Sequence, residues 1–220
     1  MPDNQPEIVY LDNHLLVLNK PAGWLTQPNE SLDSNLEEFG KQWIKQHFQK
    51  PGNVFLSAVH RLDKPVSGIV VLARTSKALS RLNEFFREGK VEKTYFSIVE
   101  GKVSEEEGVL ESWIVHDSHQ ARIVKEHTAK AKQCLLKYRV LKIQKPYTLL
   151  QISLDTGRYH QIRAQFSSHG LPILGDKKYG GISWKLDQIA LHHGEFKIPH
   201  PITKEELHWK VDISSDWPLR

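Results

Sequence analysis

The segment HRLDKPVSG, residues 60–68, sets one carboxylate among basic side chains: Asp63 stands close to His60, Arg61 and Lys64. A carboxylate is ionised at neutral pH, so it can act as a nucleophile without a general base. Basic neighbours favour its charged form further. Such an aspartate suits attack on a sugar carbon or on an activated ring. The alternative role is structural, because an aspartate before Lys-Pro commonly caps the backbone amides of a turn.

A second segment with a reactive group is KTY, residues 93–95. Tyr95 lies in an alternating stretch, where a tyrosine usually packs its ring into a core. In a cleft, the same phenol can stack on a base and still exchange a proton. The local sequence leaves both interpretations open.

The third segment, TGRYHQIR, covers residues 156–163 and carries two arginines. Arg163 and Ile162 belong to an amphipathic pattern, in which an arginine commonly faces solvent. Arg163 could instead turn inward and pair with Asp63. Arg158 lies five residues earlier, about 140° around a helix of 3.6 residues per turn. The two arginines therefore have different expected roles, and Arg158 is a candidate to contact phosphate.

The histidines and the cysteine do not predict a metal site. His116 and His119 are three residues apart, and His192 and His193 are adjacent, which places them on opposite faces of a strand. No His-Glu-x-x-His pattern and no nucleotide-binding glycine loop occurs. The single cysteine, Cys134, cannot form an intrachain disulfide or a cysteine-based zinc site. We therefore expect neither a metal nor an organic cofactor.

The composition is that of a globular protein. Of the 220 residues, 39% are hydrophobic and 25% are charged. No run approaches the ~20 apolar residues of a membrane span, and the N-terminus has no signal-like apolar region, so we expect a cytoplasmic protein. The net charge of +4 permits a polyanionic partner without requiring one.

The residues on either side of Asp63 predict the elements that must position it. Residues 7–20 predict two short strands around an Asp-Asn turn, followed by a Pro-Ala-Gly loop. Residues 33–52 predict a helix that is capped by Asp33 or Ser34 and ends at Pro51-Gly52. Its stripe consists of Leu36, Phe39, Trp43 and His47.

The residues after this turn predict a strand and a second helix. Residues 68–74, GIVVLAR, are typical of a buried central strand. Residues 75–89 predict an amphipathic helix that ends at Gly89. Its expected inward-facing residues are Leu79, Leu82 and Phe86.

The second half of the chain predicts mostly antiparallel strands. Residues 93–101 alternate as a strand, 157–170 predict a helix ending at Gly170, and 189–201 and 206–214 predict two more strands. Between them, a meander is expected over Val109–Val115, Gln120–Lys125, Gln133–Ile143 and Tyr147–Leu154. Runs of strands with a few segregated helices indicate the α+β class. No linker stands out, which predicts one domain over residues 1–220.

Five segments, in order over nearly the whole chain, resemble the RluA-type pseudouridine synthases, which isomerise uridine to pseudouridine in ribosomal and transfer RNA. They are VYLDNHLLVLNKPAGWLTQP, HRLDKPVSGIVVLAR, KTYFSIVEG, TGRYHQIRAQFSSHGLPILGDKKYGG and LHHGEFKIPHPITKEEL. The resemblance implies an α+β pseudouridine synthase fold with a mixed, mostly antiparallel sheet and a central cleft. Many relatives carry an N-terminal S4-type RNA-binding domain. We expect it to be absent, because the catalytic opening begins at about residue 7.

The resemblance also implies roles for individual residues. Asp63 would be the catalytic carboxylate, Tyr95 the ring that stacks on the target uracil, and Arg163 the partner of the aspartate. Arg61 would occupy the space left by the flipped nucleotide. The full set of candidates for substrate binding is His60, Arg61, Arg158, Ile162 and Lys20. The basic groups expected to position phosphates are Lys20, Lys64, Arg158, Lys177 and Lys178.

Two positions depart from the pattern of that family. Val66 stands where Thr is common before Ser-Gly, and Tyr159 follows TGR where Thr or Ser is commoner. Neither change affects Asp63, Tyr95 or Arg163. We interpret both as marks of subgroup or substrate.

The implied reaction requires the target nucleotide to be extruded from folded RNA. Asp63 would then assist cleavage of the N1–C1′ bond, either by attacking the sugar or by stabilising charge as the C2′ proton leaves, and the uracil would rejoin through C5. One rival is a non-catalytic RNA-binding protein of the same fold. Another is a base-releasing glycosidase, which usually needs two carboxylates, and Asp155 is the second acid available. The expected partner is a stem-loop of transfer or ribosomal RNA, bound by a monomer.

Overall fold

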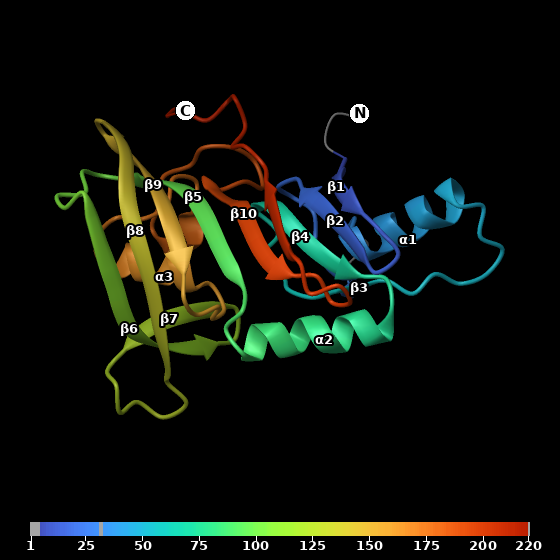
Figure 1. The fold of residues 1–220 in the computed structure, drawn as a ribbon. Coiled ribbons are helices and arrows are strands. Elements are labelled where there is room, and N and C mark those ends of the chain that lie inside the picture. Colours follow the sequence, from blue (N-terminus) through green and yellow to red (C-terminus); the bar gives the residue numbers. More distant parts are fainter. Residues whose placement is uncertain (1–4, 31–32, 220) are drawn as a thin grey trace. The chain divides into compact units, whose positions relative to one another are not determined.

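The computed structural model describes residues 5–30 and 33–219, which fall into two compact units. Unit 1 consists of Met1–Val91 and Glu195–Val211, and unit 2 of Glu92–Gly194 and Asp212–Arg220. Strand β10, Leu191–Pro199, passes from unit 2 into unit 1 (Figure 1). Each unit combines a largely antiparallel sheet with helices, so the α+β prediction is confirmed.

Unit 1 is built on the strand order β1-β2-β4-β10, with β3 beside β4 and β11 beside β10. The pairs β1–β2, β2–β4, β3–β4 and β10–β11 are antiparallel. The elements are β1 Glu7–Leu11, β2 Leu15–Lys20, α1 Leu36–His47, β3 Ser57–Ala58, β4 Ser67–Ala73, α2 Ser76–Arg87 and β11 Glu206–Lys210. The two strands predicted over residues 7–20 are therefore confirmed, and so is the strand predicted from GIVVLAR.

Strand β4 is apolar throughout because it is buried on both faces. Ile69 and Val71 pack with Leu82 and Phe85 of α2. On α1, Gly40 lies so close to Leu56 and Leu16 that an added Cβ would come within 2.5 and 3.0 Å of their Cδ atoms. Helices on two sides of a sheet produce the near-continuous hydrophobic run that buried strands show.

The details of α1 differ from the prediction. Its N-cap is Asn35, whose side chain accepts a hydrogen bond from the Glu38 amide at 3.0 Å, so neither Asp33 nor Ser34 caps it. The buried stripe is Leu36, Gly40 and Ile44, with Glu37 beside it, whereas His47 is exposed. The helix turns Gly40 inward because a close approach to β2 requires a residue without a side chain. The rings of Trp43 and His47 stack on each other instead, 4.4 Å apart.

Helix α2 follows its prediction more closely. Thr75 caps it by accepting the Ala78 amide at 3.1 Å, and the chain turns away at Gly89 with φ of 70°. Leu82 is fully buried as predicted, but Ala78 and Phe85 share the buried face with it. The predicted inward residues Leu79 and Phe86 are partly buried at the edge of this cluster.

Unit 2 has the strand order β10-β5-β9-β8-β6-β7. Its further elements are β5 Glu92–Glu100, β6 Glu107–Asp117, β7 Gln120–Val124, β8 Lys132–Gln144, β9 Tyr147–Leu154, α3 Gln161–Ser168 and the 3-10 helix η1 Lys177–Tyr179. The predicted strands are all present, but their simple meander order is wrong. The long strand β6 pairs with β7 through Trp113–Asp117 and with β8 through Glu107–Ile114, so β7 ends at the sheet edge.

The helix predicted over residues 157–170 begins only at Gln161, because His160 adopts a left-handed conformation with φ of 51°. Arg158 therefore lies in a turn before α3, and the helical angle expected between Arg158 and Arg163 does not apply. Gly170, with φ of 72°, follows the helix as predicted.

The close approach of α1 to the sheet gives a stability test. Replacing Gly40 by valine should destabilise the protein by about 1–3 kcal/mol, because the added carbons overpack the contact with Leu16 and Leu56. The matched control is Gly52→Val, since nothing lies within 4 Å of a Cβ at Gly52. Urea unfolding of both variants measures the difference, and equal stabilities would contradict this packing.

Candidate active site

The predicted site residues divide between the two units. His60, Arg61, Asp63 and Lys64 lie in unit 1 together with Lys20, and Tyr95, Arg158, Ile162 and Arg163 lie in unit 2.

Asp63 lies in the turn between β3 and β4, and its side chain is half-buried. Its carbonyl accepts the Val66 amide at 3.0 Å, which closes the turn. The preceding residue, Leu62, is held by Thr26: the Leu62 amide donates to the Thr26 hydroxyl and that hydroxyl donates to the Leu62 carbonyl, both at 3.1 Å. The backbone before the carboxylate is therefore fixed through both of its polar groups.

Lys20 fixes the backbone on the other side of Asp63. Its ammonium has no exposed surface and donates to the carbonyls of Pro21 at 3.2 Å, Trp24 at 2.6 Å and Lys64 at 3.0 Å. The Lys64 carbonyl also accepts the Gly23 amide at 2.8 Å. An ammonium has three protons, and here the backbone accepts all of them. Lys20 is thus a structural clamp in this structure, and its predicted contact with substrate phosphate stays a prediction.

The same lysine is coupled electrically to Asp63. Burial lowers the pKa of Lys20 from its ordinary 10.5 to about 7, while the negative charge of Asp63 acts to raise it. The carboxylate therefore helps to keep the buried ammonium protonated.

The neighbours of Asp63 have separate roles. Arg61 is exposed, as a group that enters RNA would need to be. The Nε2 of His60 accepts the Val71 amide at 3.2 Å, and its ring stacks on Phe196 at 5.0 Å. These two contacts join His60 to the sheet of unit 1, and its contact with substrate stays a prediction. Lys64 forms an ion pair with Asp33 at 2.9 Å.

In unit 2, Arg163 turns inward and pairs with Asp176. Its Nε donates to Oδ2 at 2.7 Å and its Nη2 to Oδ1 at 2.8 Å, with only 5% and 1% of the two residues exposed. Such a two-pronged geometry is the strongest form of this interaction. The guanidinium carbon also lies 4.9 Å from the ring centroid of Tyr179. The inward interpretation of Arg163 is confirmed, whereas its pairing with Asp63 stays a prediction.

Asp176 was missed by the sequence analysis, although it belongs to the quoted GDKKYGG segment. The signal available was one acid between glycines in an otherwise basic stretch. Gly175 has φ of 89°, and a Cβ on Gly181 would collide with the Ile173 carbonyl. The glycines thus permit the tight loop that presents the carboxylate of Asp176 to α3.

Tyr95 points into unit 2, where it is 7% exposed and its ring stacks on His193 at 4.4 Å. Ile162, predicted to bind substrate, is 4% exposed and buried. Arg158 is exposed, and its Nε donates to the Gln133 carbonyl at 3.2 Å. Of these three residues, only Arg158 is exposed.

The turn that carries Arg158 is stabilised by Gln161. Its Oε1 accepts the Arg158 amide at 3.0 Å and the Thr156 hydroxyl at 2.8 Å. Lys93 also lies against this turn, because its Nζ is 3.4 Å from the position that a Cβ on Gly157 would take. Burial lowers the pKa of Lys93, and Asp155 opposes that shift.

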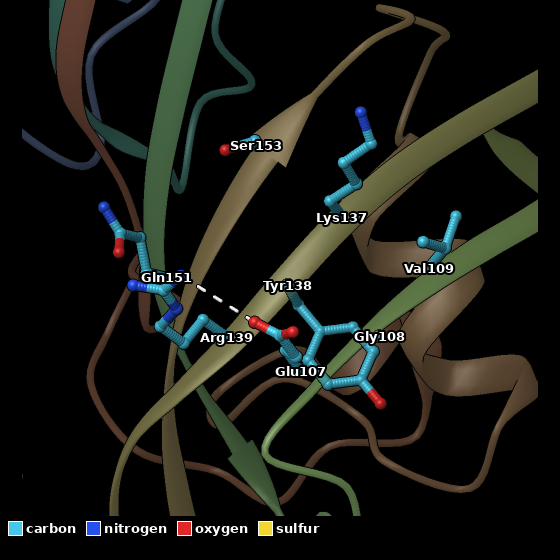
Figure 2. A pocket seen from close by; sticks show the side chains of 8 residues that line it. All are labelled: Glu107, Gly108, Val109, Lys137, Tyr138, Arg139, Gln151 and Ser153. Atoms are coloured by element: carbon cyan, nitrogen blue, oxygen red, sulfur yellow. Dashed lines mark ion pairs between the residues drawn. The ribbon is translucent and has the colours of Figure 1, made fainter.

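A cavity of about 530 Å³ lies over strands β6, β8 and β9 (Figure 2). Its two cations are both paired with acids: Arg139 with Glu107 at 3.7 Å and Lys137 with Asp155 at 3.2 Å. This balance of charge does not favour a polyanion. Over residues 5–30 and 33–219, no group of three or more His, Cys, Asp or Glu could hold a metal ion.

Comparison with known proteins identifies the family. A family model described as RNA pseudouridylate synthase matches residues 14–168. The chain belongs to this family. The match confirms the resemblance drawn from the five motifs, and the protein is an RNA pseudouridine synthase, an isomerase that acts on RNA.

Three curated relatives cover most of the chain. An RNA pseudouridine synthase of Bacillus subtilis, described as uncharacterized, is 35% identical over 96% of this chain and 69% of its own length. The tRNA pseudouridine synthase C of Vibrio parahaemolyticus is 34% identical over 96% and 92%. The ribosomal large subunit pseudouridine synthase D of Borreliella burgdorferi is 33% identical over 100% and 68%.

Solved structures agree on the fold. The human RNA pseudouridylate synthase domain containing 4 has a TM-score of 0.79 at 23% identity and covers 94% of this chain and 88% of its own. The human domain containing 1 has a TM-score of 0.75 at 23% identity, with 96% and 84% covered. Among the described residues, no helix is long and apolar enough to cross a membrane.

The coupling between Lys20 and Asp63 can be measured by NMR titration of the lysine Cε signals. Lys20 should titrate near pH 7, and Asp63→Asn should lower its pKa further by removing the opposing charge. Asp33→Asn is the control, because that acid pairs with Lys64. Between pH 7 and 10.5 Lys20 is protonated in the unfolded chain but largely deprotonated in the folded protein. The free energy of unfolding of wild type should therefore rise with pH relative to that of Lys20→Met. An unchanged pKa in Asp63→Asn would contradict the coupling.

The buried pair of unit 2 gives a second test. Asp176→Asn should cost about 3–5 kcal/mol of stability, because Arg163 keeps its charge but loses the carboxylate that compensates it. Asp117→Asn removes an exposed pair with Arg122 and should cost at most about 1 kcal/mol. Chemical unfolding compares the two variants, and similar losses would show that burial of the Arg163 pair is unimportant.

Proposed function

We propose that this pseudouridine synthase modifies a uridine in a stem-loop of transfer RNA or ribosomal RNA, with Asp63 as its catalytic carboxylate. The observation that carries the assignment is the fixed backbone on both sides of Asp63, held by Thr26 before it and by Lys20 after it. A carboxylate that must meet one atom of a bound nucleotide requires such preorganisation. The named relatives act on both RNA classes, which supports RNA of either kind.

In this proposal residues 1–220 act as one pseudouridine synthase catalytic domain. Tyr95 supplies the ring for the uracil, and Arg163 the charge that pairs with Asp63. Arg61, exposed two residues before the carboxylate, fills the space of the extruded nucleotide. Exposed Arg158, Lys177 and Lys178 contact phosphates, which positions the RNA without specifying its sequence.

The chemistry is an isomerisation that needs no oxidant, metal or organic cofactor. The N1–C1′ bond breaks, the uracil turns, C1′ bonds to C5, and the C5 proton is replaced by one on N1. Asp63 either attacks the sugar or stabilises charge while the C2′ proton leaves. Both routes require an ionised carboxylate.

The proposal has one rival in hydrolytic base release. A glycosidase would require a second carboxylate about 5–9.5 Å from the first. Asp155, the second acid near the motifs, is exposed and forms an ion pair with Lys137 at 3.2 Å. Isomerisation by a monomer in the cytoplasm, where transfer and ribosomal RNA are made in bacteria such as those of the relatives, is the function we favour.

The test of Asp63 uses RNA transcribed with 5-tritiated uridine, because only bonding at C5 releases that tritium. Wild type should release it without freeing uracil or changing the RNA mass. Asp63→Asn should lower the rate at least about 10³-fold while RNA binding and the melting temperature stay near wild type. Glu84→Gln, an exposed acid of α2, is the control and should be fully active. Free uracil would favour the glycosidase, and full activity of Asp63→Asn would remove Asp63 from catalysis.

A further inference from the structure

A column of three aromatic rings lies on the surface of unit 2. The ring of Tyr159 stacks on His160 with centroids 3.8 Å apart and planes 19° apart. His116, from strand β6, lies against Tyr159 at 4.1 Å and 38°. His160 is buried, whereas Tyr159 is 37% exposed and His116 is also exposed. We call His116, Tyr159 and His160 the ring column.

The ring column is held rigidly from three elements. His160 is left-handed and forms a hydrogen bond through Nδ1 with the Tyr179 hydroxyl at 2.8 Å. The same hydroxyl accepts the Ala121 amide of β7 at 2.8 Å. The Tyr159 hydroxyl donates to the His119 carbonyl at 3.4 Å. A left-handed non-glycine residue is kept only where its surroundings stabilise it, and such conformations gather at functional sites.

The surface around the ring column is basic. Lys178 donates to the His119 carbonyl at 3.1 Å, and the Tyr159 hydroxyl donates to that same oxygen, so the ammonium lies beside the ring. Arg158 directly precedes Tyr159 in the chain, and both Arg158 and Lys178 are exposed. Arg122 and its ion-pair partner Asp117 lie on the opposite face of the β6–β7 hairpin, because Arg122 pairs with Val115 and side chains alternate along a strand. The cations beside the ring column are therefore Arg158 and Lys178.

We propose that the ring column is a stacking site for an unpaired base of the RNA, with the phosphates beside that base held by the surrounding cations. The inference rests on the proposed function, since it assumes that the substrate is RNA. Aromatic rings flanked by basic groups bind single-stranded nucleic acid because every base has a face to stack. A ring that is already fixed loses little conformational freedom when a base covers it.

The ring column and the candidate site residue Arg163 of the same unit both contact Tyr179. Tyr179 binds His160 through its hydroxyl and lies under the Arg163 guanidinium with its ring. A base on the column is therefore bound by the same frame that holds Arg163 and Asp176. This placement suits a contact that sets which RNA is accepted, because it orients the strand relative to Arg163.

The test measures RNA binding in an Asp63→Asn background, so that no turnover occurs. The probes are a fluorescein-labelled ten-residue oligouridine and a ten-base-pair RNA duplex. Tyr159→Ser and His116→Ala should each weaken binding of the single strand about 5- to 100-fold and change duplex binding less than about twofold. Tyr159→Phe keeps the ring and should bind within about twofold of the parent protein. Phe55→Ser removes an exposed ring of unit 1 and should have no effect.

Salt dependence separates stacking from charge. Tyr159→Ser should leave the slope of log Kd against log salt unchanged, whereas Lys178→Gln should reduce it by about 0.7. If both ring variants remain folded and bind the oligouridine as tightly as the parent protein, the stacking site is wrong. Equal losses for single strand and duplex would also overturn it.

Photocrosslinking supplies a test that needs no ring variant. An oligouridine containing 4-thiouridine should crosslink wild type within the peptides that carry His116 or Tyr159. Crosslinks confined to other peptides would overturn the stacking site even if Tyr159→Ser fails to fold. Tritium release by wild type is scored separately: activity without ring-column binding removes only this inference, and ring-column binding without activity removes only the proposed function.

Discussion

A cation that is taken out of water must find acceptors for its protons, and this constraint shapes the site region of both units. In unit 1 the buried ammonium of Lys20 draws the carbonyls of Pro21, Trp24 and Lys64 around itself, which ties the Pro-Ala-Gly loop to the turn of Asp63. In unit 2 the guanidinium of Arg163 does the same with the carboxylate of Asp176. Removing either set of acceptors would cost these buried cations strong hydrogen bonds, so each loop is held in one position.

The two sheets provide different supports for these loops. Strands β2 and β4 of unit 1 are buried on both faces between α1 and α2, which makes β4 a rigid base for the Asp63 turn that precedes it. The sheet of unit 2 has α3 against one side and a polar cavity over β6, β8 and β9. The loops of unit 2 are held in position by polar contacts instead. Tyr179 joins β7, His160 and Arg163 through one hydroxyl and one ring.

Much of the fold was predictable from residue patterns, since strands and helices depend mainly on local periodicity. The strands of both units and the ends at Gly89 and Gly170 were predicted correctly. The stripe of α1 was not, because the inward position of Gly40 follows from the distance between α1 and β2. The order of β6, β7 and β8 was also wrong, since the length of β6 lets it pair on both edges. Propensity cannot reveal either fact.

For the site, the sequence alone determined the family, because the motifs stand in order, and it predicted the reactive groups from the chemistry of each side chain. It could not determine which partner each charge would meet. The sequence did not predict that backbone carbonyls would surround the Lys20 ammonium, or that the His60 ring would stack on Phe196. Asp176 pairs with Arg163 only because the loop that carries it folds back onto α3. Such partners are separated in the sequence. Only the tertiary structure brings them together and buries them, and burial requires that their charges compensate each other.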